Sequence, residues 1–369
     1  MSRAREFADL AGSADAGGIT GKNVLVNGSM AVSQRGTSST GQGASDLFLI
    51  DRFHLNTNGN SAGRFTVSQA SDGPNGIPNS LKLACTTADT SIAASERFFI
   101  EQRLEGQDCQ RFKKGTSDAE AITVSFYVKG NAAATYVVGI YDSDNSRQIG
   151  AQFSVTTSWN RVSVTFPADT GGSALDDDNA ESLSLRFYLH AGSTYTGGTL
   201  QTTWDTAVNN EQVGSGTTSI FDSTSRTFFL TGVQMEVGTL TPFEHRSFGD
   251  VLKQCERYYE KTYPYATVPG TAHSYDSIMP IRINGLNNSA SEQKYFVTRL
   301  RTEKRASPTT TYYNEAGNSG RCTTYDGAGS ADNGINIGLS ISGTAMQGFG
   351  PSNGTFSGIS CFMEHDAEL

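Results

Sequence analysis

Apolar and polar residues alternate along much of the chain, which is the pattern of β-strands that bury one face and leave the other in water. Over 122–129 the even positions are Ile, Val, Phe and Val, and over 161–166 they are Val, Val and Phe. Turn-forming Gly, Asn, Asp and Ser separate such runs. The pattern predicts strands at 23–28, 47–55, 63–69, 80–85, 98–104, 121–129, 135–141, 151–155, 160–166, 182–190 and 227–236.

So many short strands between turns predict an antiparallel β-sandwich, and about ten strands favour a jelly roll over an immunoglobulin-like arrangement. A helical period follows, with apolar residues at 248, 251, 252, 255, 258 and 259. Ser247 is placed to cap this helix and Pro264 lies beyond its end. Strand-like runs then return at 277–283, 294–300, 309–313 and 335–341.

We therefore predict an all-β chain in four parts. Residues 1–22 form a short helical anchor with a Gly-rich linker, 23–246 a jelly-roll β-sandwich, 247–264 a connecting helix, and 265–369 a second, smaller β domain. The residues expected to dock the anchor are Arg3, Arg5, Phe7 and Leu10. A frayed terminus is the alternative for this segment, because so short a helix is marginal alone.

Charge and cysteine usage exclude several classes of protein. The net charge of −9 argues against sequence-independent binding of nucleic acid, which needs dense Lys and Arg. No apolar run approaches the roughly 20 residues that span a bilayer, so we expect no membrane insertion. The N-terminus lacks the apolar core of a signal peptide. The five cysteines are scattered without a CxxC spacing, which predicts reduced, buried thiols rather than disulfides or a zinc site.

Four stretches carry a resemblance to a known family. They are 2–10, 23–37 (NVLVNGSMAVSQRGT) with Asp51-Arg52-Phe53 after it, 230–238 (LTGVQMEVG) with 241–246 (TPFEHR) after it, and 279–314. They resemble phage and prophage tail-fibre-like proteins. Between the second and third, the sequence looks like a sandwich of the carbohydrate-binding-module type, with 125–130 (SFYVKG) similar to one of its core strands.

The resemblance implies a structural virion protein, assembled in the host cytoplasm and often a homotrimer. Its N-terminal segment would hold other virion proteins of the tail or head, and its body would attach the particle, with a host-surface glycan as the expected ligand. A head-decoration or tail-connecting protein without a receptor role is the alternative, and a glycan-depolymerising enzyme is a lesser one. The resemblance brings no catalytic residue to this chain.

The residues themselves also predict no catalytic site, cofactor or metal site. The histidines are dispersed, and no Gly-x-Ser-x-Gly elbow, HExxH helix or phosphate loop is present. Glycoside hydrolysis needs two carboxyl groups about 5–10 Å apart, one with a raised pKa. Nothing in the sequence pairs the possible members, Glu96, Glu101, Glu105, Glu236 and Glu244. The acidic run 176–178 is interpreted as a solvated turn rather than a calcium loop, and 142–145 as a hairpin turn.

Sugar binding needs aromatic rings beside polar groups. Trp204 lies in a polar stretch near Tyr195, and this pair is the predicted exposed contact, whereas Trp159 is expected in the core. In the C-terminal part, Tyr312 and Tyr313 are predicted contacts, because tyrosine offers recognition area at low entropy cost. Packing alone is the alternative for each of these rings.

Overall fold

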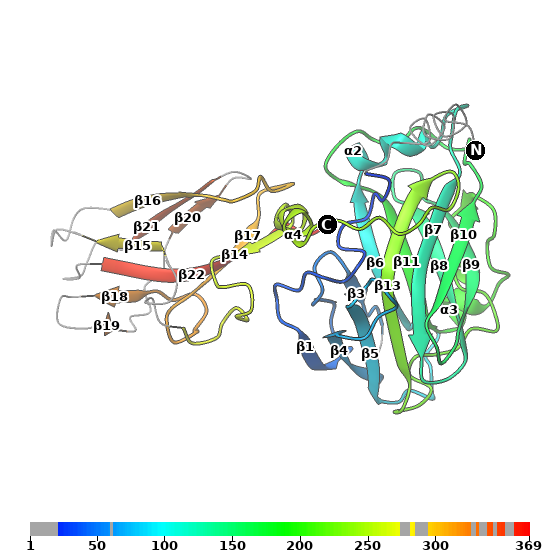
Figure 1. Ribbon diagram of the computed structural model, residues 1–369, viewed down its shortest axis with the longest axis horizontal. Helices are drawn as coiled ribbons and strands as arrows, with labels where there is room; N and C mark the ends of the chain where they lie inside the picture. Colours follow the sequence, from blue (N-terminus) through cyan, green and yellow to red (C-terminus); the bar gives the residue numbers. More distant parts are fainter. Residues whose placement is uncertain are drawn as a thin grey trace, which may run out of the picture. The chain divides into compact units, whose positions relative to one another are not determined.

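The computed structural model describes residues 21–59, 62–273, 281–284, 294–325, 330–331, 338–341, 345–350 and 358–369. The predicted anchor residues Arg3, Arg5, Phe7 and Leu10 lie outside these ranges. The chain divides into two compact units (Figure 1). The first comprises residues up to Ser33, Thr37–Val251 and Leu369, and the second Gln34–Gly36 with Leu252–Glu368. Among the described residues, no helix is long and apolar enough to cross a membrane.

The first unit is a sandwich of two antiparallel sheets, which confirms the predicted jelly-roll class. The first sheet has the order β1 (Ser38–Gln42), β4 (Arg64–Ala70), β5 (Ser80–Thr87), β13 (Thr227–Val237), β7 (Ile122–Gly130) and β10 (Asn160–Phe166). The second has the order β12 (Asp205–Thr206), β9 (Arg147–Val155), β8 (Ala134–Asp142), β11 (Glu181–Ala191), β6 (Arg97–Glu105), β3 (His54–Asn56) and β2 (Leu47–Phe48).

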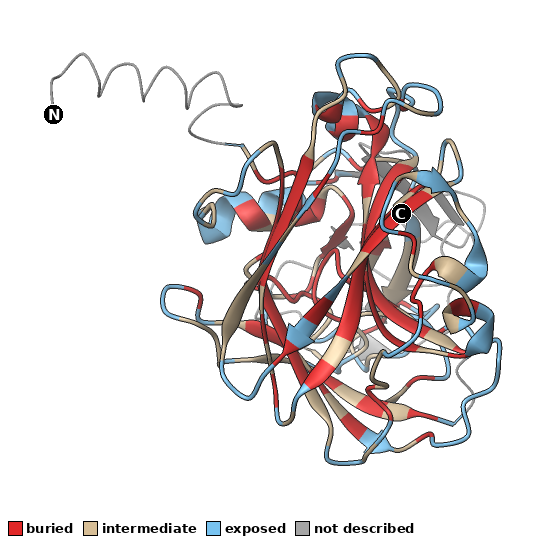
Figure 2. Ribbon diagram, turned by 90° about the vertical axis from the view of Figure 1, so that its right-hand side faces the viewer, coloured by how far each residue is buried: buried red, intermediate tan, exposed pale blue. Residues whose placement is uncertain are grey.

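The core lies between the sheets, where the alternating apolar positions meet. Ile122, Val124, Phe126 and Val128 are all buried as predicted, and Val162, Val164 and Phe166 pack against or within the same core. Phe126 meets Phe153 and Phe187 edge-on, at centroid distances of 5.0 and 4.9 Å. Buried residues, red in Figure 2, accordingly run along the strands. Burial of these rings supplies much of the driving force for folding.

Two predicted strands differ from the structure. Residues 23–28 form no strand, because Asn27 has a left-handed φ of 61° that turns the chain. The run 47–55 is not one strand but the short hairpin of β2 and β3, since Arg52, at φ 72°, bends the chain between them. The predicted turn at 142–145 does join β8 to β9, where Asn145 N donates to Asp142 Oδ1 at 3.0 Å.

Short helical turns and one longer helix complete the connections. They are α2 (Gly106–Cys109), η1 (Gln110–Phe112), α3 (Ser193–Thr196), η2 (Asn209–Glu211) and α4 (Phe248–Glu256). Ser247 caps α4 as predicted, because its Oγ accepts from Asp250 N at 3.2 Å. The predicted helix over 247–264 is too long: α4 ends at Glu256, and β14 (Tyr259–Lys261) pairs with a strand instead.

The second unit is the predicted smaller β domain. Its strand β22 (Gly358–Asp366) pairs with β14, β15 (Ile281–Asn284), β17 (Thr309–Tyr313) and β18 (Thr323–Tyr325), and β18 pairs with β19 (Ser330–Ala331). A separate antiparallel ladder joins β16 (Lys294–Arg299), β21 (Ala345–Gly350) and β20 (Gly338–Ile341). The five cysteines of the chain are free and buried, which confirms the predicted thiols: Cys85, Cys109, Cys255, Cys322 and Cys361.

Residues 34–36 belong to the second unit although they come early in the chain. Gln34 Nε2 donates to Tyr259 O at 2.9 Å. The Arg35 guanidinium lies 3.6 Å from the centroid of the Tyr259 ring and forms an ion pair with Asp366 at 2.9 Å. A segment from the second sequence motif is therefore part of the framework of the C-terminal unit.

Candidate functional site

The predicted pair Tyr195 and Trp204 lies in the segment that follows β11, but the two rings belong to different clusters. Tyr195 is 9% exposed and packs with Phe99, Tyr188 and Val213 in a small second core. Trp204 is half-buried against the main core, and its Nε1 donates to Pro167 O at 2.9 Å. Both rings therefore contribute to packing, and their role in glycan binding stays a prediction.

One face of Trp204 is covered by an internal charge. Lys114 Nζ lies 4.7 Å from its ring centroid, and this ammonium, 2% exposed, also pairs with Asp142 and Asp169. Arg147 also binds Asp169, at 2.9 Å. This buried network fixes the ends of several loops, so the surroundings of Trp204 are structural.

The predicted tyrosines of the second unit lie on β17, and both are half-buried. The Tyr313 hydroxyl donates to Glu364, and Tyr259 donates to the other oxygen of the same carboxylate at 2.7 Å. Burial raises the pKa of Tyr313 above its ordinary value. Tyr313 is thus held as a neutral donor within the sheet, and a contact of Tyr312 or Tyr313 with a sugar stays a prediction.

The segment after α3 also forms a shallow hollow of about 440 Å³. Its lining is mostly hydroxyls and carboxylates, and it includes no aromatic residue: Thr199, Leu200, Gln201, Thr202, Thr203, Asp205, Thr206, Val208 and Glu211. A sugar could hydrogen-bond here but would find no ring to stack on. Trp204 is not part of this lining.

A second region, which we call the Trp159 row, lies on the outer face of the first sheet. Phe229 of β13 stands directly opposite Lys82 of β5 and Lys129 of β7, so the three side chains form one line across three strands. Trp159 continues the line, with its ring 6.1 Å from that of Phe229 in an edge-on contact. Asp72, from the loop after β4, completes the row.

Cation–π contacts and one carboxylate bind the row together. Lys129 Nζ lies 5.1 Å from the Trp159 centroid and 4.7 Å from that of Phe229. It also pairs with Asp72 at 2.5 Å, while Trp159 Nε1 donates to the other oxygen of Asp72 at 3.0 Å. These two hydrogen bonds, from Lys129 first and from Trp159 second, lower the pKa of Asp72.

The row is accessible from solvent. Trp159 is half-buried, and 43% of the Asp72 side chain and 20% of the Lys129 side chain are exposed. The prediction that Trp159 lies in the core is therefore wrong. The alternating pattern contains the information needed to place this ring. Val162, Val164 and Phe166 point inward, so Trp159, at an odd position, points outward.

The carboxylates considered for glycoside hydrolysis are held by donors. Glu101 is fully buried among His54, Arg103 and Arg186. Burial opposes its ionisation, but the hydrogen bond from His54 and the two arginine charges outweigh it and lower its pKa to about 2. Glu244 accepts from the backbone of Gly21 and Asn23, and its pKa is also lowered, against the effect of burial. Neither group has the raised pKa of a general acid.

The acidic run 176–178 is exposed, which confirms the solvated turn. Asp176 N donates to Asp144 Oδ2 at 3.0 Å, so this turn lies beside the β8–β9 hairpin.

Comparison with known proteins gives structural matches alone. No family model matches the chain, and no curated protein matches its sequence. Solved structures that match part of the chain include a putative sugar binding protein from Bacteroides thetaiotaomicron (14% identity, TM-score 0.32, 59% of this chain and all of that one). A family 11 carbohydrate-binding module from Clostridium thermocellum, in complex with a β-1,3-1,4-mixed-linked tetrasaccharide, matches at 12% identity and a TM-score of 0.28, over 56% of this chain and 99% of that one. A family 30 carbohydrate-binding module matches at 11% identity and a TM-score of 0.29, over 60% and 91%.

Proposed function

We propose that this chain is a non-enzymatic attachment protein of a phage particle that binds a surface glycan through the Trp159 row. The observation that carries the proposal is a half-buried indole beside the outer face of the first sheet, with the Lys129 ammonium over one face of the ring and the Asp72 carboxylate at its Nε1. An aromatic ring offers a stacking surface for the apolar face of a pyranose. Asp72 and Lys129 supply an acceptor and a donor for sugar hydroxyls.

The charge of the row favours a glycan with anionic groups. Lys82 and Lys129 outnumber Asp72, so the row is positive within a chain of net charge −9. Such local complementarity speeds encounter and weakens with added salt. Several copies of a weak site on one particle would give high avidity.

Glycan-array binding of the full chain, with Trp159→Ala, tests the site. A central tryptophan contact is worth about 2 kcal/mol, so the variant should bind roughly thirty-fold more weakly. Tyr265→Ala, which removes a 38% exposed ring from the second unit, is the matched control and should bind as the wild type does. Trp204→Phe tests the sequence-predicted site, and loss of binding there with binding kept in Trp159→Ala would move the glycan to the surroundings of Trp204. A chain that binds no glycan overturns the function itself.

The absence of catalysis is part of the proposal. Glu101 and Glu244 are kept ionised by their partners, which suits ion-pair and capping roles rather than proton donation. Incubation of the full chain with every glycan that it binds should release no reducing ends. Measured release would replace attachment by depolymerisation.

The virion role rests on the tail-fibre resemblance of the stretches 23–37 and 230–238. Immunogold labelling of particles should place the protein on the tail, and label confined to the head would favour the decoration alternative. Light scattering should give three times the chain mass of 39.4 kDa. A monomer would contradict the trimer.

A further inference from the structure

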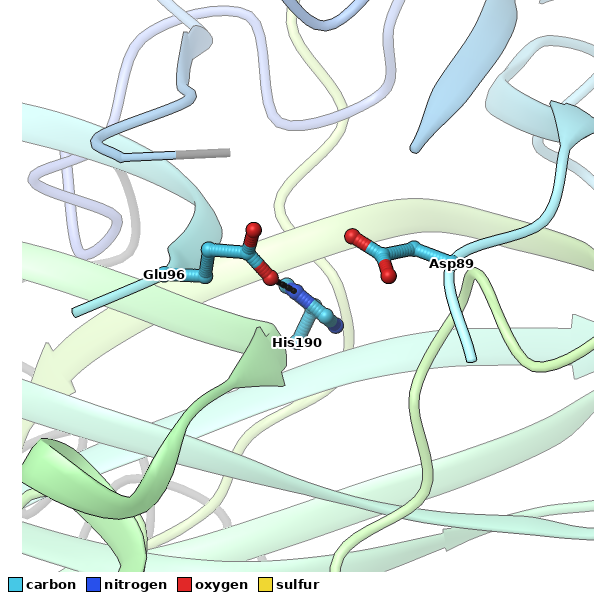
Figure 3. A group of neighbouring side chains, drawn as sticks. All are labelled: Asp89, Glu96 and His190. Carbon is cyan, nitrogen blue, oxygen red and sulfur yellow. Dashed lines mark ion pairs between the residues drawn. The ribbon is translucent and has the colours of Figure 1, made fainter. Parts of the chain in front are cut away.

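Three buried side chains with metal-ligand chemistry converge inside the first unit (Figure 3). Asp89, Glu96 and His190 are 4%, 1% and 2% exposed. One ligand atom from each lies within 4.8 Å of the others. Asp89 follows β5, Glu96 precedes β6 and His190 is near the end of β11, so the group draws on both sheets.

The two carboxylates stand at the two ends of an exposed loop. Residues 90–95 are solvent-exposed, while Asp89 and Glu96 turn inward. Asp89 N donates to Phe221 O at 2.9 Å, and Glu96 O accepts from Gly192 N at 2.8 Å. The backbone therefore fixes both ends, and each carboxylate is directed at the same imidazole.

Hydrogen bonding within the group is incomplete. Asp89 Oδ1 accepts from Ser91 N at 3.1 Å, but its Oδ2 is buried without a hydrogen-bond partner among the residues that the structure describes. His190 Nε2 is also buried without one, and Glu96 Oε2 lies 3.5 Å from it. Buried polar atoms are normally satisfied, because leaving them unpaired is costly.

The histidine is oriented so that its unsatisfied nitrogen faces the carboxylates. His190 Nδ1 lies 2.8 Å from Ser219 Oγ, which also accepts from Phe221 N at 2.9 Å. If Nδ1 carries the proton and donates to Ser219, Nε2 presents a lone pair to two carboxylates. In the other tautomer the Nε2 proton is too far from Glu96 for a good hydrogen bond. Either arrangement lacks a positive charge at the point where the three groups meet.

We propose that Asp89, Glu96 and His190 bind a divalent first-row transition ion, for which Zn²⁺ is the best fit. One imidazole nitrogen and two carboxylate oxygens form a ligand set that suits Zn²⁺, whereas Ca²⁺ takes oxygen ligands. Bonds of about 2.0–2.2 Å bring ligand atoms roughly 3–4 Å apart, so a small inward movement closes the site. The two negative charges balance the ion.

The surroundings support a structural site. The Ser219 hydroxyl holds the second nitrogen of the imidazole and so fixes the orientation of the ring, which is the role of the outer hydrogen-bond partner of a metal-binding histidine. The Phe221 ring meets His190 edge-on at 5.1 Å and restricts its rotation. The bound ion would join β5, β6 and β11 and hold the loop 90–95 in place.

Metal binding by the full, untagged chain tests this inference independently of any glycan. After chelation and dialysis, titration with Zn²⁺ should reach about one ion per chain and raise the unfolding temperature of the first unit. Asp89→Asn and His190→Gln should each weaken binding by at least tenfold. Asp46→Asn, which changes a half-exposed carboxylate on the same unit, should bind as the wild type does.

The Asp89→Asn variant also separates ligation from folding. It removes a buried negative charge without changing the side-chain size, so the metal-free variant should be at least as stable as the metal-free wild type. Cobalt substitution should give a visible absorption band in the wild type that both variants lose. Failure of the wild type to bind Zn²⁺, or equal binding by both variants, overturns the site. Binding of Ca²⁺ alone would overturn the assignment to a transition ion.

Discussion

The side-chain amide of Asn23 completes the backbone pairing of Met235. Asn23 Oδ1 accepts from Met235 N at 3.0 Å, its Nδ2 donates to Val233 O at 3.0 Å, and Val24 N donates to Met235 O at 3.0 Å. Asn23 and Met235 come from the two sequence motifs on which the tail-fibre resemblance most depends. Those motifs therefore encode one structural corner of the sandwich, beside β13.

Asn23→Ala should destabilise the first unit by about 2 kcal/mol, because it leaves buried donors and acceptors unpaired. Both tryptophans lie in the first unit, so tryptophan fluorescence during urea unfolding reports on that unit. Asn58→Ala, at an exposed position, is the control and should change the unfolding free energy by less than about 0.5 kcal/mol. Equal effects would mean that the corner contributes nothing specific.

Glu101 predicts acid sensitivity of the same unit. Its pKa is about 2 in the folded chain and about 4.3 in an unfolded one. The stabilisation is therefore complete above pH 4.3 and is lost as the pH falls toward 2. It amounts to roughly 3 kcal/mol.

Glu101→Gln should flatten the dependence of the unfolding free energy on pH between 4.5 and 2, and should lower stability at pH 7. Glu120→Gln changes a carboxylate that is 39% exposed, and it should keep the wild-type profile. A Glu101→Gln profile as steep as that of the wild type would contradict the prediction.

Gly232 and Gly238 form a matched pair within the third motif. Both have a left-handed φ, of 59° and 75°. A Cβ at Gly232 would lie 2.7 Å from the Tyr127 ring and 2.8 Å from Ile77, whereas no atom lies within 4 Å at Gly238. We expect Gly232→Ala to lower the free energy of unfolding by about 3 kcal/mol and Gly238→Ala to lower it by about 1 kcal/mol. Urea unfolding measures both values. Equal costs would show that backbone strain alone matters.

His365 predicts a pH response of the second unit. Burial lowers its pKa to about 4, below the roughly 6.5 of an unfolded histidine. The unfolded chain then binds a proton more readily, so stability falls as the pH drops from 6.5 to 4 and is constant below. His365→Gln should flatten the dependence of the unfolding free energy on pH in this range. Unfolding is measured by near-ultraviolet circular dichroism of the tyrosines. His245→Gln, in the first unit, should leave this dependence as steep as in the wild type.

The sequence predicts well those features that repeat along a strand. The alternation at 122–129 identified both the strand and its inward face, because a period of two survives any tertiary arrangement. The stretch 23–28 shows the same composition, but its pairing runs through the Asn23 side chain and a left-handed Asn27, which alternation does not encode.

Sites assembled from distant residues are harder to predict. The expectation that Trp159 lies in the core rests on its place directly before a strand, although its odd position directs the ring outward. Asp89 follows β5 of one sheet and His190 lies in β11 of the other, with no common spacing in the sequence, so only the folded sandwich brings them together. The buried carboxylates likewise acquire their partners from the fold rather than from their neighbours in sequence.

Residues 34–36 limit how this protein could exchange its C-terminal unit during evolution. A recombination event that replaced residues 252–368 would keep Gln34 and Arg35 but would replace their partners, Tyr259 and Asp366. A replacement unit would keep these contacts only if it presented a carbonyl oxygen to Gln34 and an aromatic ring and a carboxylate to Arg35. Residues 34–36 thus restrict which C-terminal units are compatible with this chain. In related sequences, substitutions at Tyr259 and Asp366 should be accompanied by substitutions at Gln34 and Arg35.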